Sequence, residues 1–242
     1  MNISVNIAEN AEELGKRAAR TIAELLNNAI SEKGEARVVL STGKSQFTTL
    51  SALVNENVDW TKVEMFHLDE YVGLDETHPA SFRKYLKDRF ISLVPLKAYY
   101  LVSGEEAIPY LTEKLREKDI DVGVIGIGEN GHIAFNDPPA DFQTEQAYKT
   151  VILDERCRKQ QVGEGWFKTI SDVPEKAITM CPKTILAARH IVSAVPYKVK
   201  AEAVYKTLTE PVNNTVPATL LKTSADWHLF LDSDSASLLL PI

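Results

Sequence analysis

Short apolar runs alternate with longer amphipathic segments along most of the chain. The short runs are rich in β-branched residues and are bounded by polar or glycine-containing stretches, a pattern typical of buried strands. The runs predict strands at Ile3–Ile7, Ala36–Leu40, Val63–His67, Ala98–Leu101, the run that begins at Val122, Tyr148–Leu153, Lys176–Met180, His190–Val195 and Trp227–Leu231.

The longer segments carry apolar residues at helical spacing. After Asn10, the segment AEELGKRAARTIAELLNNAI places Leu14, Ala18, Ile22 and Leu25 on one face. Asn10 is a good N-cap, acidic residues follow it in the first turn, and a glycine at position 34 closes the turn after the helix. Further helices are predicted at 47–57, 81–90, 105–118, 154–163, 182–188 and 198–208.

Repeated alternation of strands and helices favours parallel pairing, because each helix carries the chain back to start the next strand. We therefore predict an α/β fold: a single doubly wound, mainly parallel, Rossmann-like sheet with helices on both faces. The chain has no repeat, no low-complexity tract and no long Pro/Gly linker. We expect one domain over residues 1–242.

Composition narrows the function classes. The net charge of −7 gives no overall basic field, so we expect no nucleic-acid partner. No apolar run approaches the roughly 20 residues of a membrane span, and the N-terminus lacks a signal peptide's basic start and apolar middle. Cys157 and Cys181 form neither a metal-ligand spacing nor a disulfide framework, and both are interpreted as packing residues. We expect a cytoplasmic protein.

Three polar loops follow predicted strands, at Ser41–Gln46, Asp69–Gly73 and Gly128–Pro139. In a parallel sheet, ligands bind at the carboxyl ends of the strands. The three loops are therefore predicted to meet. This shared location is a stronger indication of a site than any single motif.

The third of these loops presents a histidine. The stretch Val122–Pro139 breaks from an apolar run into glycines and then carries His132 between Asn130 and Asp137. Either neighbour could fix the tautomer of the imidazole, as in an acid–base catalyst. The stretch alone is equally consistent with a hydrogen-bonded loop histidine beside a glycine turn.

The first loop has the features of a small anion site. Residues 41–45, STGKS, follow a strand and precede a helix, where free N–H groups can face a ligand. The spacing GxxxxGK[ST] of nucleotide-binding loops is absent, so a monophosphate fits better than a nucleotide. Lys198 and Lys200 follow another strand and could reach the same phosphate. An ordinary glycine turn and exposed lysines are the alternatives.

The second loop supplies adjacent carboxylates, Asp69 and Glu70, which point to different sides of the chain. One could face a site while the other is held structurally, although a solvated acidic loop has the same sequence. We find no nucleophile elbow of the GxSxG type. The five histidines have no close ligand spacing, so we predict no metal site.

These segments together resemble the glucosamine-6-phosphate deaminase (isomerase) family over nearly the whole chain. FHLDEYVGL at Phe66–Leu74 is similar to the aspartate motif of the family, and GENGHIAFNDP at Gly128–Pro138 is similar to its histidine motif. STGKSQ stands in the place of the phosphate loop, and VPYKVKAEAV resembles the segment with the phosphate lysine. The superfamily also contains 6-phosphogluconolactonase.

The resemblance implies an aminosugar phosphate as the small-molecule substrate, conversion of glucosamine 6-phosphate to fructose 6-phosphate and ammonia, and no cofactor. It implies that Asp69 moves a proton between carbons 2 and 1, and that His132 opens the sugar ring. Asp137 and Asn130 would orient His132. The residues expected to bind phosphate or substrate are Ser41, Thr42, Gly43, Lys44, Ser45, Gly131, Arg158 and Lys200.

The chain departs from the family pattern at several positions. Asp137 stands where the family has glutamate, and Asn130 stands where many members have aspartate. His67 replaces asparagine, and Gln161 is the nearest counterpart of a phosphate-binding arginine, with Arg158 as a substitute. Lys44 and Gln46 replace a small residue and a proline.

These departures leave the substrate open between glucosamine and galactosamine 6-phosphates. A lactonase and a non-catalytic sugar-phosphate sensor are further alternatives. The chain ends soon after its last predicted strand, without the C-terminal extension of allosteric hexameric members. We therefore expect a monomer or small homo-oligomer without aminosugar activation.

Overall fold

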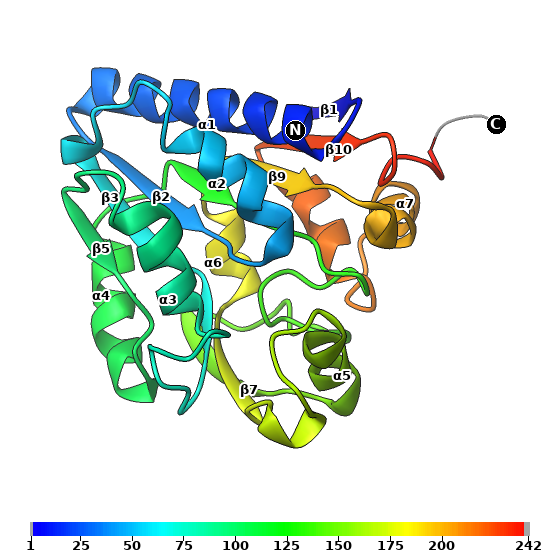
Figure 1. Ribbon diagram of the computed structural model, residues 1–242. Helices are drawn as coiled ribbons and strands as arrows, with labels where there is room; N and C mark the ends of the chain where they lie inside the picture. Colours follow the sequence, from blue (N-terminus) through cyan, green and yellow to red (C-terminus); the bar gives the residue numbers. More distant parts are fainter. Residues whose placement is uncertain (1, 240–242) are drawn as a thin grey trace.

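A computed structural model describes residues 2–239 and contains the predicted parallel sheet (Figure 1). Seven strands in this range form it, in the order β1-β10-β9-β6-β2-β3-β5, and every neighbouring pair is parallel. The strands are β1 (Asn2–Ala8), β2 (Ala36–Leu40), β3 (Val63–His67), β5 (Ala98–Tyr100), β6 (Val122–Val124), β9 (His190–Val195) and β10 (Asp226–Asp232). The predicted α/β fold class is confirmed.

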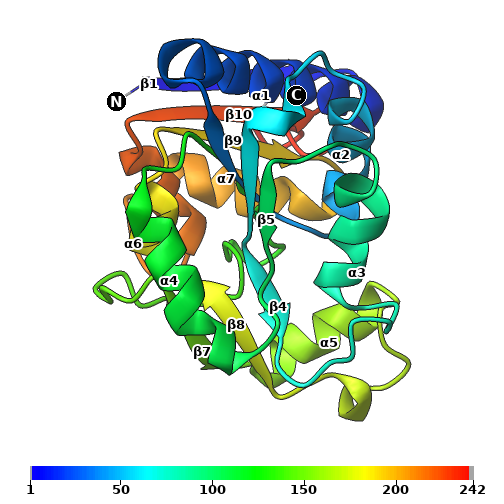
Figure 2. The ribbon, with the colours of Figure 1, turned by 90° about the vertical axis from the view of Figure 1, so that its left-hand side faces the viewer.

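Helices cover both faces of this sheet (Figure 2). They are α1 (Ala11–Lys33), α2 (Phe47–Leu53), α3 (Phe82–Leu86), α4 (Ile108–Glu117), α5 (Glu155–Gly163), α6 (Pro182–Leu186) and α7 (Ala201–Thr209). Short 3₁₀ segments are η1 (Lys44–Gln46), η2 (Trp60–Lys62), η4 (Glu105–Ala107), η5 (Ile170–Asp172), η6 (Lys198–Lys200) and η7 (Pro217–Thr223), and η3 (Lys87–Ile91) is a π-helical turn. One core lies between the sheet and α1, α2 and η3, and a second lies between the sheet and α4, α6 and α7.

Helix α1 shows how local sequence determines an element. The side chain of Asn10 accepts a hydrogen bond from the backbone N–H of Glu13 at 3.0 Å, as predicted for the N-cap. Gly34 ends the helix in the left-handed region, with φ of 82°, where glycine avoids the strain that a side chain would cause. The buried face differs from the predicted one by one position, since Leu26 is fully buried and Leu25 only partly.

The prediction of a single sheet is wrong. Strands β4 (Asp69–Tyr71), β8 (Lys176–Met180) and β7 (Tyr148–Ile152) form a separate three-stranded antiparallel sheet, in the order β4-β8-β7. The apolar runs correctly predicted strands β7 and β8. An apolar run does not indicate which other strand it pairs with, so the separate sheet was not predicted. Strand β4 was expected to be a loop, because two of its three residues are acidic.

The small sheet is attached directly to the end of β3. Leu68 alone separates β3 from β4, and its carbonyl accepts a hydrogen bond from the N–H of Met180 at 2.9 Å. The hydroxyl of Tyr148 donates to the carbonyl of His67 at 2.6 Å. These two bonds hold the small sheet against the carboxyl edge of the large one. Among residues 2–239, the helices are too short or too polar to cross a bilayer.

Candidate active site

A cavity of about 220 Å³ lies where the two sheets meet, at the carboxyl ends of strands β2, β3, β6 and β9. Its volume is below the range of roughly 300–1,000 Å³ that is usual for drug-sized ligands, which favours a small molecule. The lining comes from residues 41–45, 68–69 and 126–129, with Phe82, His132, Ala134, Phe135, Gln160, Gln161, Glu164, Trp166, Tyr197, Val199 and Lys200.

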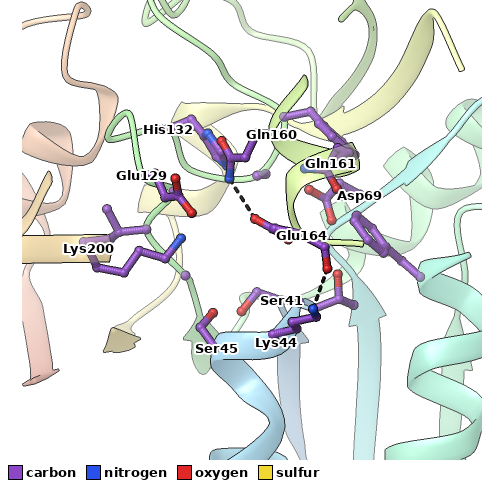
Figure 3. A pocket seen from close by; sticks show the side chains of 18 of the residues that line it. Ser41, Lys44, Ser45, Asp69, Glu129, His132, Gln160, Gln161, Glu164 and Lys200 are labelled. Carbon is purple, nitrogen blue, oxygen red and sulfur yellow. Dashed lines mark hydrogen bonds between the residues drawn. The ribbon is translucent and has the colours of Figure 1, made fainter. Parts of the chain in front are cut away.

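The three polar loops meet at this cavity (Figure 3). All five residues from Ser41 to Ser45 line it, together with Asp69, His132 and Lys200. Two residues expected to bind substrate, Gly131 and Arg158, do not line it. Asn130 and Asp137 also lie outside the lining, where they contact the ring of His132.

The adjacent carboxylates of β4 have different surroundings. Glu70 is buried, and its oxygens accept hydrogen bonds from the hydroxyl of Ser81 at 2.9 Å and from the backbone N–H of Arg83 at 2.9 Å. Glu70 therefore holds the start of α3. Asp69 lines the cavity, and within residues 2–239 its carboxylate makes no hydrogen bond. One acid is structural and the other is free to act on a ligand.

Burial raises the pKa of Asp69 well above its usual value, and the negative charge of Glu70 raises it further. Asp69 is only 6% exposed. A carboxylate in these surroundings is more basic than one in water, because the site does not stabilise its charged form. This is the property required of a general base that removes a proton from carbon.

The ring of His132 is fixed by a short chain of hydrogen bonds. Its Nδ1 lies 2.6 Å from the side-chain carbonyl oxygen of Asn130, which can only accept, so Nδ1 carries the proton. The amide of Asn130 in turn donates to Asp137 at 3.1 Å, and the carboxylate of Asp137 lies 3.3 Å from the same Nδ1. This tautomer leaves Nε2 as the nitrogen that can exchange a proton with a ligand.

Asp137 remains a carboxylate under ordinary conditions. Burial acts to raise its pKa, but hydrogen bonds with His132, Asn130 and Cys157 outweigh this effect and lower the pKa to about 2. A negative charge so close to Nδ1 stabilises the cation that forms when Nε2 takes a proton. Cys157 is thus a buried neighbour of this network, although its sequence context marks it only as a packing residue.

Two glycines give the histidine loop its shape. A Cβ at position 128 would lie about 2.1 Å from the ring of His132, so any side chain there would displace the imidazole. Gly131 has a φ of 83°, and a Cβ on it would meet Val216 at 2.9 Å. Gly131 therefore contributes its conformation and close packing, which explains its place in the motif without contact to the cavity.

Lys200 brings a buried positive charge to the cavity. It is 8% exposed, and burial lowers its pKa although Glu164 and Glu129 oppose the shift. Its ammonium makes no hydrogen bond to residues 2–239, which is an arrangement suited to an anionic ligand. The alternative lysine, Lys198, instead donates to the hydroxyl of Ser237 at 2.8 Å.

The side chain of Lys44 extends to the part of the cavity wall that is formed by the end of α5 and the residues after it. We call this part of the wall the roof. Its ammonium donates to the backbone carbonyl of Glu164 and lies 5.7 Å from the centre of the Trp166 ring. The carboxylate of Glu164 accepts hydrogen bonds from Gln160 at 2.9 Å and from the indole of Trp166 at 3.1 Å. Lys44 thus joins the loop after β2 to the roof (Figure 3).

Several lining residues were not predicted from the sequence. Gln160, Glu164 and Trp166 come from a segment with no motif, and only the fold brings it over the strand ends. Tyr197 and Ala134 line the cavity with φ of 82° and 51°, in the left-handed region that non-glycine residues rarely adopt. Such strain is frequent at functional sites, but residue type alone does not reveal it.

Two departures from the family pattern have structural explanations. His67 is fully buried, and burial lowers its pKa to about 3, so it is neutral. Its Nδ1 accepts a hydrogen bond from the N–H of Val102 at 3.3 Å, which makes it a packing residue of β3. Gln161 accepts a hydrogen bond from the hydroxyl of Tyr71 at 2.7 Å and lines the cavity where Arg158 does not.

Comparison with known proteins places this geometry in a family. The sequence profile described as Glucosamine-6-phosphate isomerases/6-phosphogluconolactonase matches residues 9–229. The chain is 34% identical over 239 residues to a glucosamine-6-phosphate deaminase of Exiguobacterium sibiricum, covering 96% of this chain and 92% of the relative.

Solved structures agree with the sequence match. A monomeric glucosamine-6-phosphate deaminase superposes with a TM-score of 0.86 at 30% identity, over 98% of this chain and 100% of its own. A 6-phosphogluconolactonase from Thermotoga maritima superposes with a TM-score of 0.79 at 14% identity, over 96% of this chain and 100% of its own. The second likeness shows a shared fold only.

Proposed function

Because the chain belongs to the glucosamine-6-phosphate isomerase/6-phosphogluconolactonase family, we propose that it is a glucosamine-6-phosphate deaminase. It converts glucosamine 6-phosphate and water to fructose 6-phosphate and ammonia. The observation that carries the proposal is the placement of a buried carboxylate, Asp69, and an oriented imidazole, His132, in one cavity with a buried cation, Lys200.

Ring opening is the first task of the site. The hydroxyl on carbon 1 must lose a proton and the ring oxygen must gain one before the open-chain aldehyde forms. His132 suits this step, because Asn130 and Asp137 hold the proton on Nδ1 and leave Nε2 to transfer a proton to the ring oxygen. The charge that His132 carries between the two transfers is stabilised by Asp137.

Isomerisation is the task of Asp69. Its carboxylate removes the proton from carbon 2 and returns it to carbon 1, while one proton of the amine passes to the aldehyde oxygen, so the aldehyde becomes an alcohol and the amine on carbon 2 becomes an imine. Water then adds to carbon 2 and ammonia leaves, which gives the ketose. The buried position of Asp69 favours this step, because a desolvated carboxylate is a stronger base.

Phosphate recognition is assigned to residues 41–45 and to Lys200. The loop is polar, and the first turn of the helical segment that follows it leaves backbone N–H groups without intrahelical partners. Lys200 supplies a desolvated positive charge, which strengthens its attraction to a dianion. Lys44 reaches the same ligand only if it leaves the carbonyl of Glu164.

The two sheets act together, because the base comes from the small sheet and the imidazole and phosphate loop come from the edge of the large one. We therefore propose that residues 1–242 work as one domain. A cytoplasmic location is consistent with Cys157 and Cys181, which are free and buried.

The decisive assay measures ammonia and ketose phosphate released from glucosamine 6-phosphate. We expect turnover on this substrate, slower turnover on galactosamine 6-phosphate, and no acceleration of 6-phosphogluconolactone hydrolysis. Faster reaction of the galactosamine epimer would reassign the substrate, and lactone hydrolysis without ammonia release would replace the deaminase by a lactonase. Binding without turnover of either aminosugar would indicate a sensor.

We predict that the protein is a monomer with hyperbolic kinetics, because its structure is similar to that of a monomeric deaminase. Light scattering after size-exclusion chromatography should give a mass near the 26.9 kDa of one chain. The rate should follow a hyperbola in glucosamine 6-phosphate, with no activation by N-acetylglucosamine 6-phosphate. A hexamer with sigmoidal kinetics would contradict the prediction.

The length of the side chain at position 137 should matter. We expect Asp137→Glu to lower kcat about three- to tenfold with KM little changed, because the extra methylene moves the carboxylate relative to Asn130 and to Nδ1 of His132. The matched control is Asp141→Glu, an exposed acid in the same loop. Equal kinetics of Asp137→Glu and the original protein would mean that the shorter acid has no catalytic consequence.

A further inference from the structure

The fold assembles two histidines and an aspartate at the end of the large sheet opposite to the cavity. His190 is the first residue of β9 and Asp226 is the first residue of β10, whereas the cavity lies at the carboxyl ends of the strands. His228 lies two residues after Asp226, so both side chains are on the same face of β10. The two histidines have no close spacing along the sequence, and the fold brings them together.

The three side chains converge through one atom each. Asp226 Oδ2 lies 2.7 Å from Nδ1 of His190 and 2.8 Å from Nε2 of His228. All three atoms lie within 4.8 Å of one another, and no other such group occurs in residues 2–239. Two imidazoles and one carboxylate form a ligand set that suits zinc and the neighbouring divalent transition metals.

Two of the remaining polar atoms of the cluster are held by strand β1. The hydroxyl of Ser4 lies 3.0 Å from Nδ1 of His228 and can accept a hydrogen bond from that nitrogen once a metal takes the place of the Nε2 proton that now faces Asp226. The amide of Asn2 donates to Asp226 Oδ1 at 2.9 Å and leaves Oδ2 for the shared position. Such partners, which orient ligands from behind, are characteristic of metal sites.

The present distances are those of hydrogen bonds, so binding a metal requires a small expansion. Tetrahedral zinc with bonds of about 2.0–2.1 Å keeps its ligand atoms about 3.3 Å apart. The oxygen–nitrogen distances must therefore open by about half an ångström. Side chains that are 18–36% exposed can move this far by small rotations.

We propose that His190, Asp226 and His228 form a structural site for a divalent transition metal of the zinc class, with water completing the coordination. The metal joins β9 to β10, and Ser4 and Asn2 extend the link to β1. Because the site lies at the opposite end of the strands from Asp69 and His132, it stabilises the fold and takes no part in the reaction.

The test is calorimetric titration of the EDTA-treated full chain with zinc chloride in a buffer that does not bind metals. We expect one zinc ion per chain with a Kd in the micromolar range or below, and a higher melting temperature with zinc present. Cobalt(II) should give the visible absorption of a tetrahedral centre. Deaminase activity should be the same before and after removal of the metal.

His228→Gln and His190→Asn should each weaken zinc binding about 100-fold or more and remove the cobalt spectrum. Ser4→Ala keeps all three ligands and should weaken zinc binding about tenfold, so the proposal stays testable if a ligand variant does not fold. His78→Asn, which lies outside the cluster, should bind zinc as the original protein does. No stoichiometric zinc binding, or full binding by both ligand variants, would overturn the proposal.

Discussion

Asp69→Asn should reduce kcat for ammonia release from glucosamine 6-phosphate by about 10²–10⁴-fold, the range that general acid–base catalysis contributes. The amide has nearly the same shape, but it cannot accept the proton from carbon 2. KM should change little, because phosphate recognition is assigned to another part of the cavity. Steady-state kinetics on purified protein give both constants, and Asp75→Asn, an exposed acid after β4, is the matched control.

The same variant should be more stable than the original protein. The pKa of Asp69 is raised in the fold by burial and by Glu70, so deprotonation is harder in the folded than in the unfolded chain. Its contribution to stability is complete below the pKa of the unfolded chain and is lost as pH rises through the higher folded value. At pH 7.5, Asp69→Asn removes that loss and should raise the melting temperature. A variant that lost activity through misfolding would melt lower.

The raised pKa also predicts the acid side of the pH–rate profile. Only the deprotonated form of Asp69 can act as a base, so kcat should fall as pH decreases through the raised pKa. The fall should therefore occur at a clearly higher pH than the usual range of a carboxyl group. An activity that persisted undiminished down to about pH 4 would exclude Asp69 as the base.

Lys200→Met should raise KM for glucosamine 6-phosphate by about 10- to 100-fold. A hydrogen bond to a charged group contributes about 1.5–3 kcal/mol, and methionine keeps the length of the side chain without its charge. Inorganic phosphate should also lose its ability to compete with substrate. Lys198→Met, whose partner is the hydroxyl of Ser237, should retain the original KM.

An unchanged KM in Lys200→Met would transfer phosphate recognition to the loop after β2 and to Lys44. Loss of structure would not explain an increase in KM, because replacing a buried cation by an apolar group removes a desolvation cost. Thermal unfolding of both variants distinguishes the two explanations. Lys200→Met should melt at or above the temperature of the original protein.

Much of the large sheet was predictable because its central strands are buried on both faces. The bounds predicted for β2, β3 and β9 agree with the structure, since continuous apolar runs have few other solutions. The small sheet was not predictable in the same way. Strand β4 forms because it pairs with β8. Two of its three residues are acidic, so a search for apolar positions does not predict it.

The site was predictable where its residues follow strands and not where they depend on distant packing. Asp69, His132 and Lys200 each come just after a strand, so their meeting follows from parallel topology. Trp166 lines the cavity only because the fold places α5 over the strand ends. No local sequence pattern predicts this placement. The metal cluster was missed for a similar reason, since 36 residues separate His190 from Asp226.

The attachment of the small sheet has a consequence for how such an enzyme can diversify. The carboxylate of Asp69 is carried by β4, whereas the phosphate loop follows β2 of the large sheet. Substitutions in β7 or β8 can therefore shift the base by fractions of an ångström and leave the anchor of the substrate intact. Related enzymes could acquire a preference for another epimer by this route, through changes in β7 and β8, whose residues do not line the cavity.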